Sequence, residues 1–252
     1  MDRIFRIKQG MSGRYALERD GGLYWLEGDP FSHYHAGGLI EESGLRFVAP
    51  VMPQKIMAIG LNYKDHAAEM NKKLPEEPLV FMKPMTSVIG PDAPIKLPMW
   101  AGRIDHEAEM AIVIGRRAHK VSAADAMDYV LGVTCLNDVT ARELQVKDVQ
   151  YTRAKGFDTF SPIGPCVAVG VDPSALSIEG WVNGEKRQSS NTNQLIFPVP
   201  ELIAFVTRFA TLEPGDIITT GTPSGVGPLK PGDRMMVKIE GVGTLSNPCV
   251  AE

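Results

Sequence analysis

Two glutamates separated by one residue stand at the start of an apolar run. Glu107 and Glu109 precede residues 111–114, which are Ala, Ile, Val and Ile. Side chains alternate between the two faces of a β-strand, so both carboxylates would lie on one face, about 7 Å apart at the backbone. Carboxylates this close raise each other's pKa unless a cation lies between them. The spacing therefore predicts a cation site, although an isolated pair of this kind is more often a solvent-exposed charged strand.

A third oxygen ligand is available at Asp138. It follows Asn137 at the end of a second apolar run, over residues 129–136. Three carboxylates without a cluster of cysteine and histidine favour Mg²⁺ or Mn²⁺ over zinc. Such a site leaves coordination positions open for water or for a chelating substrate. Taken alone, Asp138 would more readily be a turn or helix N-cap residue.

His66 and Glu69 could supply acid-base chemistry. They are three residues apart in segment 63–72, whose spacing predicts a helix. Side chains at this separation lie next to each other on one helix face. The pair could therefore act as a general base whose imidazole is oriented by a carboxylate. The alternative is a surface histidine in an ordinary helix ion pair.

Lys155 is a candidate for binding negative charge. It lies in the sequence RAKGFD, residues 153–158, where an uncharged neighbour and a glycine predict a partly buried turn. An ammonium there could bind a carboxylate or stabilise a developing oxyanion. A single lysine, however, is usually solvated at the protein surface.

Short apolar runs and turn residues predict the elements that position these side chains. Strands are expected at residues 5–8, 23–26, 56–59 and 107–114. Helices are expected at residues 63–72, at 122–131 with Ser122 as the N-cap, and at 201–209 with Pro200 in the first turn. Two Pro-Gly-Asp turns, at 214–216 and 231–233, separate strands in the last fifth of the chain, and we expect both to be chain reversals only.

Size and charge restrict the class of protein and its partners. The 252 residues, 44% of them hydrophobic, can form a sizeable core in one large domain with a small appendage. The 26 basic and 30 acidic residues are spread along the chain, which argues against nucleic acid as a partner. The glycine-rich segment 221–227 lacks the patterns of a phosphate loop and of a dinucleotide fold. No nucleotide site is therefore predicted.

The N-terminal sequence and the cysteines bear on location. Charges interrupt the first residues, which lack the apolar run of a secretory signal, and no apolar stretch approaches the roughly 18 residues of a membrane span. Three widely spaced cysteines, at positions 135, 166 and 249, suit free thiols in a reducing compartment. We therefore expect a cytoplasmic protein that has no membrane partner.

Six short motifs follow one another along the chain. They are GLNYKDHAAE (60–69), FMKP (81–84), DHEAE (105–109), NDVTAR (137–142), KGFDTF (155–160) and TTGTP (219–223). In this order, and over about residues 51–252, they closely resemble the fumarylacetoacetate hydrolase family. The density of the match identifies the chain as a member of that family.

The resemblance implies a fold, a cofactor and an assembly. The fold would be α+β and dominated by strands, a mixed β-sandwich roll over residues 51–252, with residues 1–50 as a small β-rich N-terminal extension. The cofactor would be Mg²⁺ or Mn²⁺, and the protein would be a homodimer. The residues that would hold the metal are Glu107, Glu109 and Asp138.

The resemblance also assigns roles around the metal. His66 and Glu69 would act together as the general base near the substrate, and Lys155 would face the metal site. The residues expected to contact the substrate are Lys83, Arg142, Gln145 and Thr222. The polar segment 71–78, which contains prolines, is expected to be a mobile lid.

Family members that resemble this chain differ in the reaction they catalyse. They include acylpyruvate hydrolases, oxaloacetate decarboxylases, and isomerases of unsaturated 2-hydroxy diacids or of oxaloacetate. In each, a small 2-oxo acid would chelate the metal, which stabilises an enolate at the adjacent carbon. If His66 activates water, a carbon–carbon bond is hydrolysed; if His66 only moves protons, the enzyme is a tautomerase or isomerase.

Our first expectation is hydrolysis of a carbon–carbon bond in a 2,4-dioxo acid of the acylpyruvate type, with decarboxylation of oxaloacetate as an accompanying activity. It is motivated by the expected lid and by the cationic residues Lys83, Arg142 and Lys155, which suit a doubly oxygenated anion. The alternatives are an isomerase or tautomerase of 2-hydroxy-dienedioates or oxaloacetate, and a non-catalytic metal-binding protein that kept only the fold.

Overall fold

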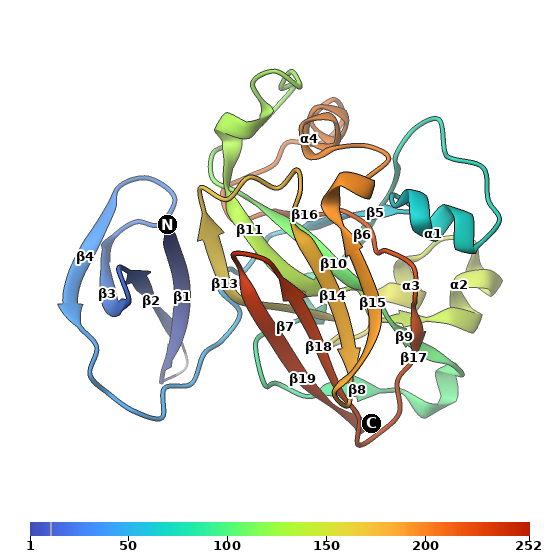
Figure 1. Cartoon of the computed structure of the whole chain (residues 1–252), viewed down its shortest axis with the longest axis horizontal. Helices are drawn as coiled ribbons and strands as arrows, with labels where there is room; N and C mark the ends of the chain where they lie inside the picture. Colours follow the sequence, from blue (N-terminus) through green and yellow to red (C-terminus); the bar gives the residue numbers. More distant parts are fainter. Residues whose placement is uncertain (11) are drawn as a thin grey trace.

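A mixed sheet of 11 strands extends along the computed structural model, which describes residues 1–10 and 12–252 (Figure 1). In spatial order its main path consists of β4 (Tyr34–Leu39), β3 (Gly22–Gly28), β2 (Ser12–Arg19), β1 (Asp2–Gln9), β13 (Ser161–Val169), β11 (Val130–Asn137), β10 (Ala108–Ile114), β16 (Ile217–Thr219), β5 (Ile56–Gly60) and β6 (Leu79–Lys83). The short strand β7 (Val88–Ile89) pairs in parallel with β13.

A second sheet packs against the central strands of the first. Its order is β15 (Glu185–Asn191), β14 (Ser177–Val182), β18 (Arg234–Ile239), β19 (Gly243–Ala251) and β8 (Ile95–Leu97). Strands β14 and β18 contact β10, and β18 and β19 contact β11. A small third sheet is formed by β12 (Thr140–Ala141), β9 (Ile104–His106) and β17 (Gly227–Pro228). This arrangement confirms the expected α+β fold dominated by strands.

Strand β10 is buried on both faces, which explains why the apolar residues after Glu109 do not alternate with polar ones. On one face, Ile112 belongs to the core between the two sheets, together with Ile178. On the other face, Val113 belongs to a second core together with Val167. The carboxylates that precede this run therefore lie next to the best-packed part of the molecule.

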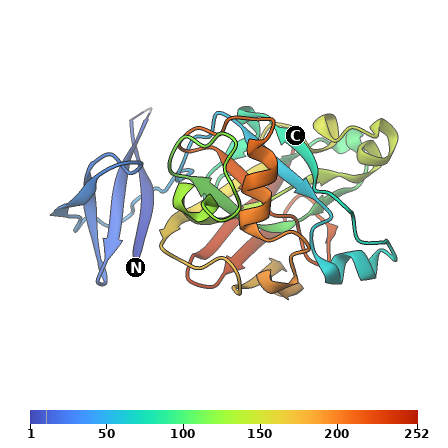
Figure 2. The ribbon, with the colours of Figure 1, turned by 90° about the horizontal axis from the view of Figure 1, so that it is seen from above.

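Residues 1–10 and 12–50 contain four antiparallel strands at one end of the molecule, as Figures 1 and 2 show. The strands expected at 5–8 and 23–26 lie within β1 and β3. Strand β1 also pairs with β13, where Ile4 is opposite Val167. The N-terminal strands therefore continue the main sheet.

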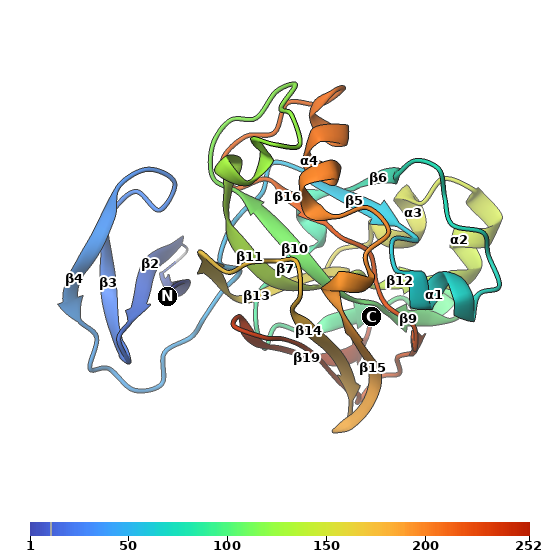
Figure 3. The ribbon, with the colours of Figure 1, turned by 45° about the horizontal axis from the view of Figure 1, so that its top comes forward.

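Four short α-helices are present in the described chain. They are α1 (Lys64–Glu69), α2 (Arg142–Asp148), α3 (Thr152–Lys155) and α4 (Val199–Thr207). Single 3₁₀ turns are η1 (Met85–Ser87), η2 (Met99–Ala101), η3 (Ala126–Tyr129) and η4 (Thr192–Gln194). Figures 1 and 3 place α1, α2 and α3 together at the end opposite β1–β4. None of the helices in the described residues is long and apolar enough to cross a membrane.

Two of the three predicted helices are present in the structure, with different bounds. The helix expected at 201–209 is α4, which begins and ends two residues earlier, with Pro200 in its first turn. The helix expected at 63–72 is the shorter α1. Helices α2 and α3 were not predicted, because few apolar residues mark their buried faces.

The helix predicted at 122–131 is wrong. The segment contains only the 3₁₀ turn η3, and β11 begins at Val130. The Ser122 hydroxyl donates to the Asp125 carboxylate at 2.7 Å and closes a single turn. The apolar residues that follow gain more from pairing with β10 than from extending that turn, because β11 is covered on both faces.

The first Pro-Gly-Asp turn is more than a chain reversal, which corrects our expectation. The Asp216 carboxylate is buried and accepts hydrogen bonds from the backbone N–H groups of Gln54, Lys55 and Glu213, at 3.1, 3.0 and 2.7 Å. The Lys55 ammonium forms an ion pair with it at 2.5 Å. This carboxylate therefore fixes the start of β5 beside β16, its parallel neighbour.

Candidate active site

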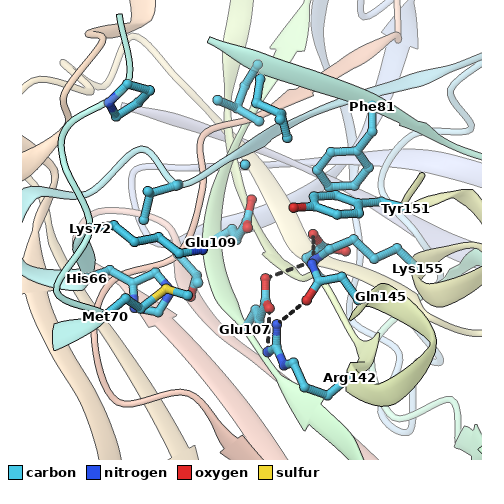
Figure 4. A pocket seen from close by; sticks show the side chains of 17 residues that line it. His66, Met70, Lys72, Phe81, Glu107, Glu109, Arg142, Gln145, Tyr151 and Lys155 are labelled. Carbon is cyan, nitrogen blue, oxygen red and sulfur yellow. Dashed lines mark hydrogen bonds and ion pairs between the residues drawn. The ribbon is translucent and has the colours of Figure 1, made fainter. Parts of the chain in front are cut away.

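A cavity of about 220 Å³ opens at the end of the molecule where α1, α2 and α3 meet (Figure 4). Most of the residues predicted to act in catalysis or binding line it. They are His66, Glu107, Glu109, Asp138, Arg142, Gln145, Lys155 and Thr222. Phe81 lines it as well, so all six motifs, which are far apart in the sequence, contribute to one site.

Strand pairing brings the three carboxylates together. Glu107 lies between β9 and β10, Glu109 lies in β10, and Asp138 follows β11. In the register of β10 and β11, Ala108 is opposite Asn137. The Asp138 N–H also donates to the Glu107 carbonyl at 2.8 Å. As a result, each carboxylate offers an oxygen that lies within 4.8 Å of the other two, and all three residues are buried.

The electrostatics of these carboxylates differ. Burial raises the pKa of Glu109 well above its usual range, and the nearby charges of Asp138 and Glu107 raise it further. Burial acts in the same direction on Glu107, but Lys155 and Arg142 outweigh it and lower the pKa of Glu107 to about 2. Glu109 is thus the carboxylate whose negative charge is least compensated by the protein.

A hard divalent ion fits this set of residues. Oxygens bound to one Mg²⁺, Mn²⁺ or Ca²⁺ lie roughly 2.0–2.6 Å from it, so two of them can be at most about 4.0–5.2 Å apart. The oxygens of the three carboxylates lie within 4.8 Å of one another, which is inside the upper end of this range and slightly beyond the roughly 4.2 Å that two oxygens can span across Mg²⁺. The donors are all carboxylate oxygens, which suits Mg²⁺ or Mn²⁺ better than a softer ion. A cation here would also relieve the repulsion at Glu109.

Lys155 lies directly against the cluster. Its ammonium contacts Glu107 at 3.0 Å, Asp138 at 2.6 Å and the Thr140 hydroxyl at 2.7 Å. Burial alone would lower the pKa of Lys155, but the charges of Asp138 and Glu107 raise it above its usual value. Lys155 therefore carries a positive charge, held at the end of α3 between two predicted metal ligands.

Lys83 was predicted to contact the substrate, but the structure places it elsewhere. Its ammonium pairs with Asp138 and donates to the Phe160 carbonyl at 2.8 Å. The residue is 1% exposed and does not line the cavity. Strand β6 thus places it behind Asp138, and it contacts a predicted metal ligand instead of the space where a substrate would bind.

The first turn of α2 carries Arg142 and Gln145 on one face. The Arg142 guanidinium donates to Gln145 Oε1 at 2.7 Å, to Glu107 at 2.7 Å and to Asp105 at 3.0 Å. Asp105 is buried and was not assigned a role from the sequence. Asp105 lies in the same motif as Glu107, and this was the one feature of the sequence that could have indicated its role. Asp105 therefore orients Arg142 from the side away from the cavity.

His66 and Glu69 form the predicted pair on α1. The Nδ1 atom of His66 is hydrogen-bonded to Glu69 Oε2 at 2.9 Å, and His66 is nearly buried in the cavity wall. The Gly225 N–H donates to Glu69 Oε1 at 3.1 Å, which holds this carboxylate behind the imidazole. The other ring nitrogen, Nε2, is therefore the one available to a ligand in the cavity.

The glycine-rich segment 221–227 supports the carboxylates. The Gly221 N–H donates to Glu109 Oε2 at 3.0 Å, and the Thr222 hydroxyl donates to the Ala108 carbonyl at 2.9 Å. Gly225 has a φ of 93°, and a Cβ at this position would lie 2.1 Å from the Arg187 carbonyl oxygen. Only glycine allows this close approach. The sequence excluded a nucleotide site here but did not indicate this role.

Gln188 links the second sheet to the site, and nothing in the sequence pointed to it. It is fully buried in β15. Its side-chain oxygen accepts the Ala108 N–H at 2.9 Å, and its side-chain nitrogen donates to the Thr222 hydroxyl at 2.8 Å. Tyr151, which packs edge to face on Phe81 and lines the cavity, was also not predicted.

Comparison with known proteins agrees with this geometry. The family model described as fumarylacetoacetate (FAA) hydrolase C-terminal matches residues 55–250. The chain therefore belongs to the fumarylacetoacetate hydrolase family.

Three similar proteins have names that specify a reaction. The chain is similar to oxaloacetate tautomerase fahd2, mitochondrial, from Xenopus laevis, with 43% identity over 84% of this chain and 70% of that protein. Its structure resembles 5-carboxymethyl-2-hydroxymuconate delta-isomerase from Mycobacterium smegmatis, with a TM-score of 0.92, 41% identity and coverage of 99% and 100% of the two chains. It also resembles 2-hydroxyhepta-2,4-diene-1,7-dioate isomerase from Mycobacterium marinum, with a TM-score of 0.92, 39% identity and coverage of 100% and 99%. These names favour the isomerase alternative over the hydrolysis that we expected first.

Proposed function

We propose that the protein is a Mg²⁺- or Mn²⁺-dependent tautomerase or isomerase that moves a proton beside the carbonyl of a small 2-oxo acid. The observation that carries this proposal is the placement of His66. Glu69 binds its Nδ1, and its ring lines the same small cavity as the three carboxylates. The tautomerase and isomerase names of similar proteins support proton transfer as the reaction.

The carboxylates of Glu107, Glu109 and Asp138 would hold the ion. When bound, it supplies Lewis-acid stabilisation for negative charge on a substrate oxygen. Lys155 is fixed beside two of these carboxylates, so its ammonium adds positive charge at the same end of the cavity. The substrate's carboxylate and 2-oxygen are therefore expected to bind here.

His66 would carry the proton. In the direction from enol to ketone, Nε2–H gives its proton to the carbon next to the 2-oxo group, and the carbon–carbon double bond supplies the electron pair of the new C–H bond. The enol hydroxyl releases its proton to solvent as its oxygen becomes the carbonyl, and the imidazole, left neutral by the transfer, takes up one proton from solvent. The substrate keeps its composition, and no water or oxidant is consumed. Glu69 orients the ring and stabilises the imidazolium form.

Ketonisation of freshly dissolved enol-oxaloacetate, followed by stopped-flow absorbance, tests this function. The protein with Mg²⁺ should accelerate the loss of enol over the buffer rate, a chelator should remove that acceleration, and Mg²⁺ or Mn²⁺ should restore it. An acylpyruvate in H₂¹⁸O provides the opposing assay. Label in the released carboxylic acid, without any acceleration of ketonisation, would make hydrolysis the better description. Inactivity towards acylpyruvates, oxaloacetate and 2-hydroxy-dienedioates would favour the non-catalytic alternative.

A further inference from the structure

The cations around the cavity differ in what they pair with. The Arg142 guanidinium forms an ion pair with Glu107 at 2.7 Å. The Lys155 ammonium forms ion pairs with Glu107 and Asp138 at 3.0 and 2.6 Å. Lys72 also lines the cavity, yet within the described chain no carboxylate forms an ion pair with its ammonium. Lys72 is therefore the cavity-lining lysine whose charge remains available to a ligand.

The end of helix α1 fixes the backbone from which the Lys72 side chain extends. The Lys72 N–H donates to the Ala67 carbonyl at 2.9 Å, and the Asn71 N–H donates to the Ala68 carbonyl at 3.0 Å. Asn71 has a φ of 51°, in the left-handed region. These two hydrogen bonds around a left-handed residue form a Schellman motif. The motif holds Lys72 at a defined position relative to His66, on the preceding turn.

The two walls of the cavity carry different groups, as Figure 4 shows. Lys72 extends into the cavity from the wall that also carries His66 and Met70. Arg142 and Gln145 lie on the other side, with the buried glutamates between the walls. A ligand that binds the carboxylate cluster with one end would therefore direct its other end past His66 toward Lys72.

We propose that Lys72 is a specificity-determining residue that pairs with the second carboxylate of a dicarboxylic 2-oxo acid; this inference rests on the function proposed above. The first carboxylate and the 2-oxygen would bind at the end that contains Glu107, Glu109 and Asp138. The reacting carbon would then lie between that end and Lys72, beside His66. A short diacid suits a cavity of about 220 Å³.

A pair of variants and a pair of substrates test this role. Lys72→Met removes the charge and keeps most of the aliphatic side chain, and Lys73→Met is the matched control, because Lys73 is exposed and does not line this cavity. The substrates are enol-oxaloacetate and its 4-methyl ester, in which a methyl ester group replaces the second carboxylate. Lys72→Met should lower kcat/KM for the diacid about tenfold, mainly through KM, and leave the ester unchanged within about twofold. Lys73→Met should change neither.

A binding measurement separates this inference from the proposed reaction. Malate and its 4-methyl ester, which cannot ketonise, are titrated calorimetrically into the protein in excess Mg²⁺. The parent should bind malate more tightly than the ester, and Lys72→Met should remove that preference. The preference should also decrease at high ionic strength, because Lys72 is exposed.

Three outcomes are distinguishable. A loss of preference in Lys72→Met, with or without turnover by the parent, supports the role of Lys72. An equal loss for diacid and ester, or the same loss in Lys73→Met, overturns it. Failure of the parent to accelerate ketonisation of either substrate overturns the proposed reaction, and the malate titrations still decide whether Lys72 recognises the second carboxylate.

Discussion

His66 is held from one side and open on the other, which is the arrangement that a proton-transfer residue requires. Its Nδ1 is bound by Glu69, and Glu69 is held in turn by the Gly225 N–H. The imidazole therefore cannot rotate without breaking its hydrogen bond to Glu69, a carboxylate that is itself held in place. The remaining nitrogen is fixed toward the cavity, so its position does not depend on the bound ion.

The first prediction concerns this imidazole. His66→Ala should lower kcat for ketonisation about 10²- to 10⁴-fold, because it removes a positioned general acid-base. Mg²⁺ affinity, measured by calorimetry, should stay within about threefold, because His66 does not contact the carboxylates that would hold the ion. Glu69→Gln should cause a smaller loss of kcat, since the imidazole remains. Loss of Mg²⁺ binding in His66→Ala would mean that His66 is a metal ligand.

The second prediction concerns Glu109, whose charge is repelled by its neighbours and balanced least by the protein. Excess Mg²⁺ should raise the melting temperature of the parent, because an ion that binds only the folded state stabilises it by about 2.7 kcal/mol at 100 times its Kd. Glu109→Gln should lose this increase. In chelator, the variant should melt no lower than the parent, because the substitution removes repulsion among buried carboxylates. A large loss of stability in chelator would show that the charge itself is required for folding.

The third prediction concerns the free cysteines. Burial raises the pKa of Cys166 and Cys249 from 9.0 to about 12. An Ellman-type reagent at pH 8 should therefore react slowly with the native protein and rapidly after unfolding in urea. Between pH 9 and 12 only the unfolded state releases the thiol proton, so stability falls as pH rises. The unfolding free energy of the parent should decline relative to Cys166→Ala by up to about 1.4 kcal/mol per pH unit above 9.

At the scale of elements, the sequence predicted those features of the structure that depend on residues close together in the chain. The apolar run after Glu109 and the three-residue spacing of His66 and Glu69 were sufficient for β10 and for the pair on α1. The place of Lys83 was not predictable from spacing, because it depends on how β6 packs behind Asp138. The helix prediction for segment 122–131 was wrong for the same reason. The strand that begins there is stabilised by pairing with β10, which the local sequence does not encode.

The fourth prediction compares the two Pro-Gly-Asp turns. Asp216→Ala should lower the free energy of unfolding by about 3 kcal/mol, because it leaves the Lys55 ammonium and three backbone N–H groups without their acceptor. Asp233→Ala is the control, since Asp233 is more exposed and accepts the Lys230 N–H at 2.7 Å at the surface. It should cost less than about 1 kcal/mol. Urea unfolding with an unchanged m-value provides the measurement, and equal losses for both variants would contradict the difference we assign to burial.

At the scale of the whole molecule, one surface beside the cavity combines an edge strand with apolar side chains. Strand β6 ends the order of the main sheet, so one of its sides has no strand partner along that path. Leu79 and Met82 on β6 are about half exposed, and Val146 and Val149 near the end of α2 are 77% and 81% exposed. Residues of β6 and the segment that begins at Val149 line a common groove. Exposed apolar groups that gather next to an unpaired edge are typical of a surface that is covered by another chain.

The fifth prediction is that a second copy of this chain covers that surface, which would make the protein the homodimer expected from its family. Light scattering after size exclusion should give a dimer for the parent and a monomer for Val149→Asp. The Val149 side chain is exposed and belongs to neither hydrophobic core, so this variant should not unfold the monomer. Leu39→Asp, at an exposed apolar residue of β4 at the opposite end of the molecule, should remain dimeric. A parent that is monomeric at all concentrations would contradict the dimer. If Leu39→Asp disrupts the dimer and Val149→Asp does not, the interface lies on the N-terminal strands instead.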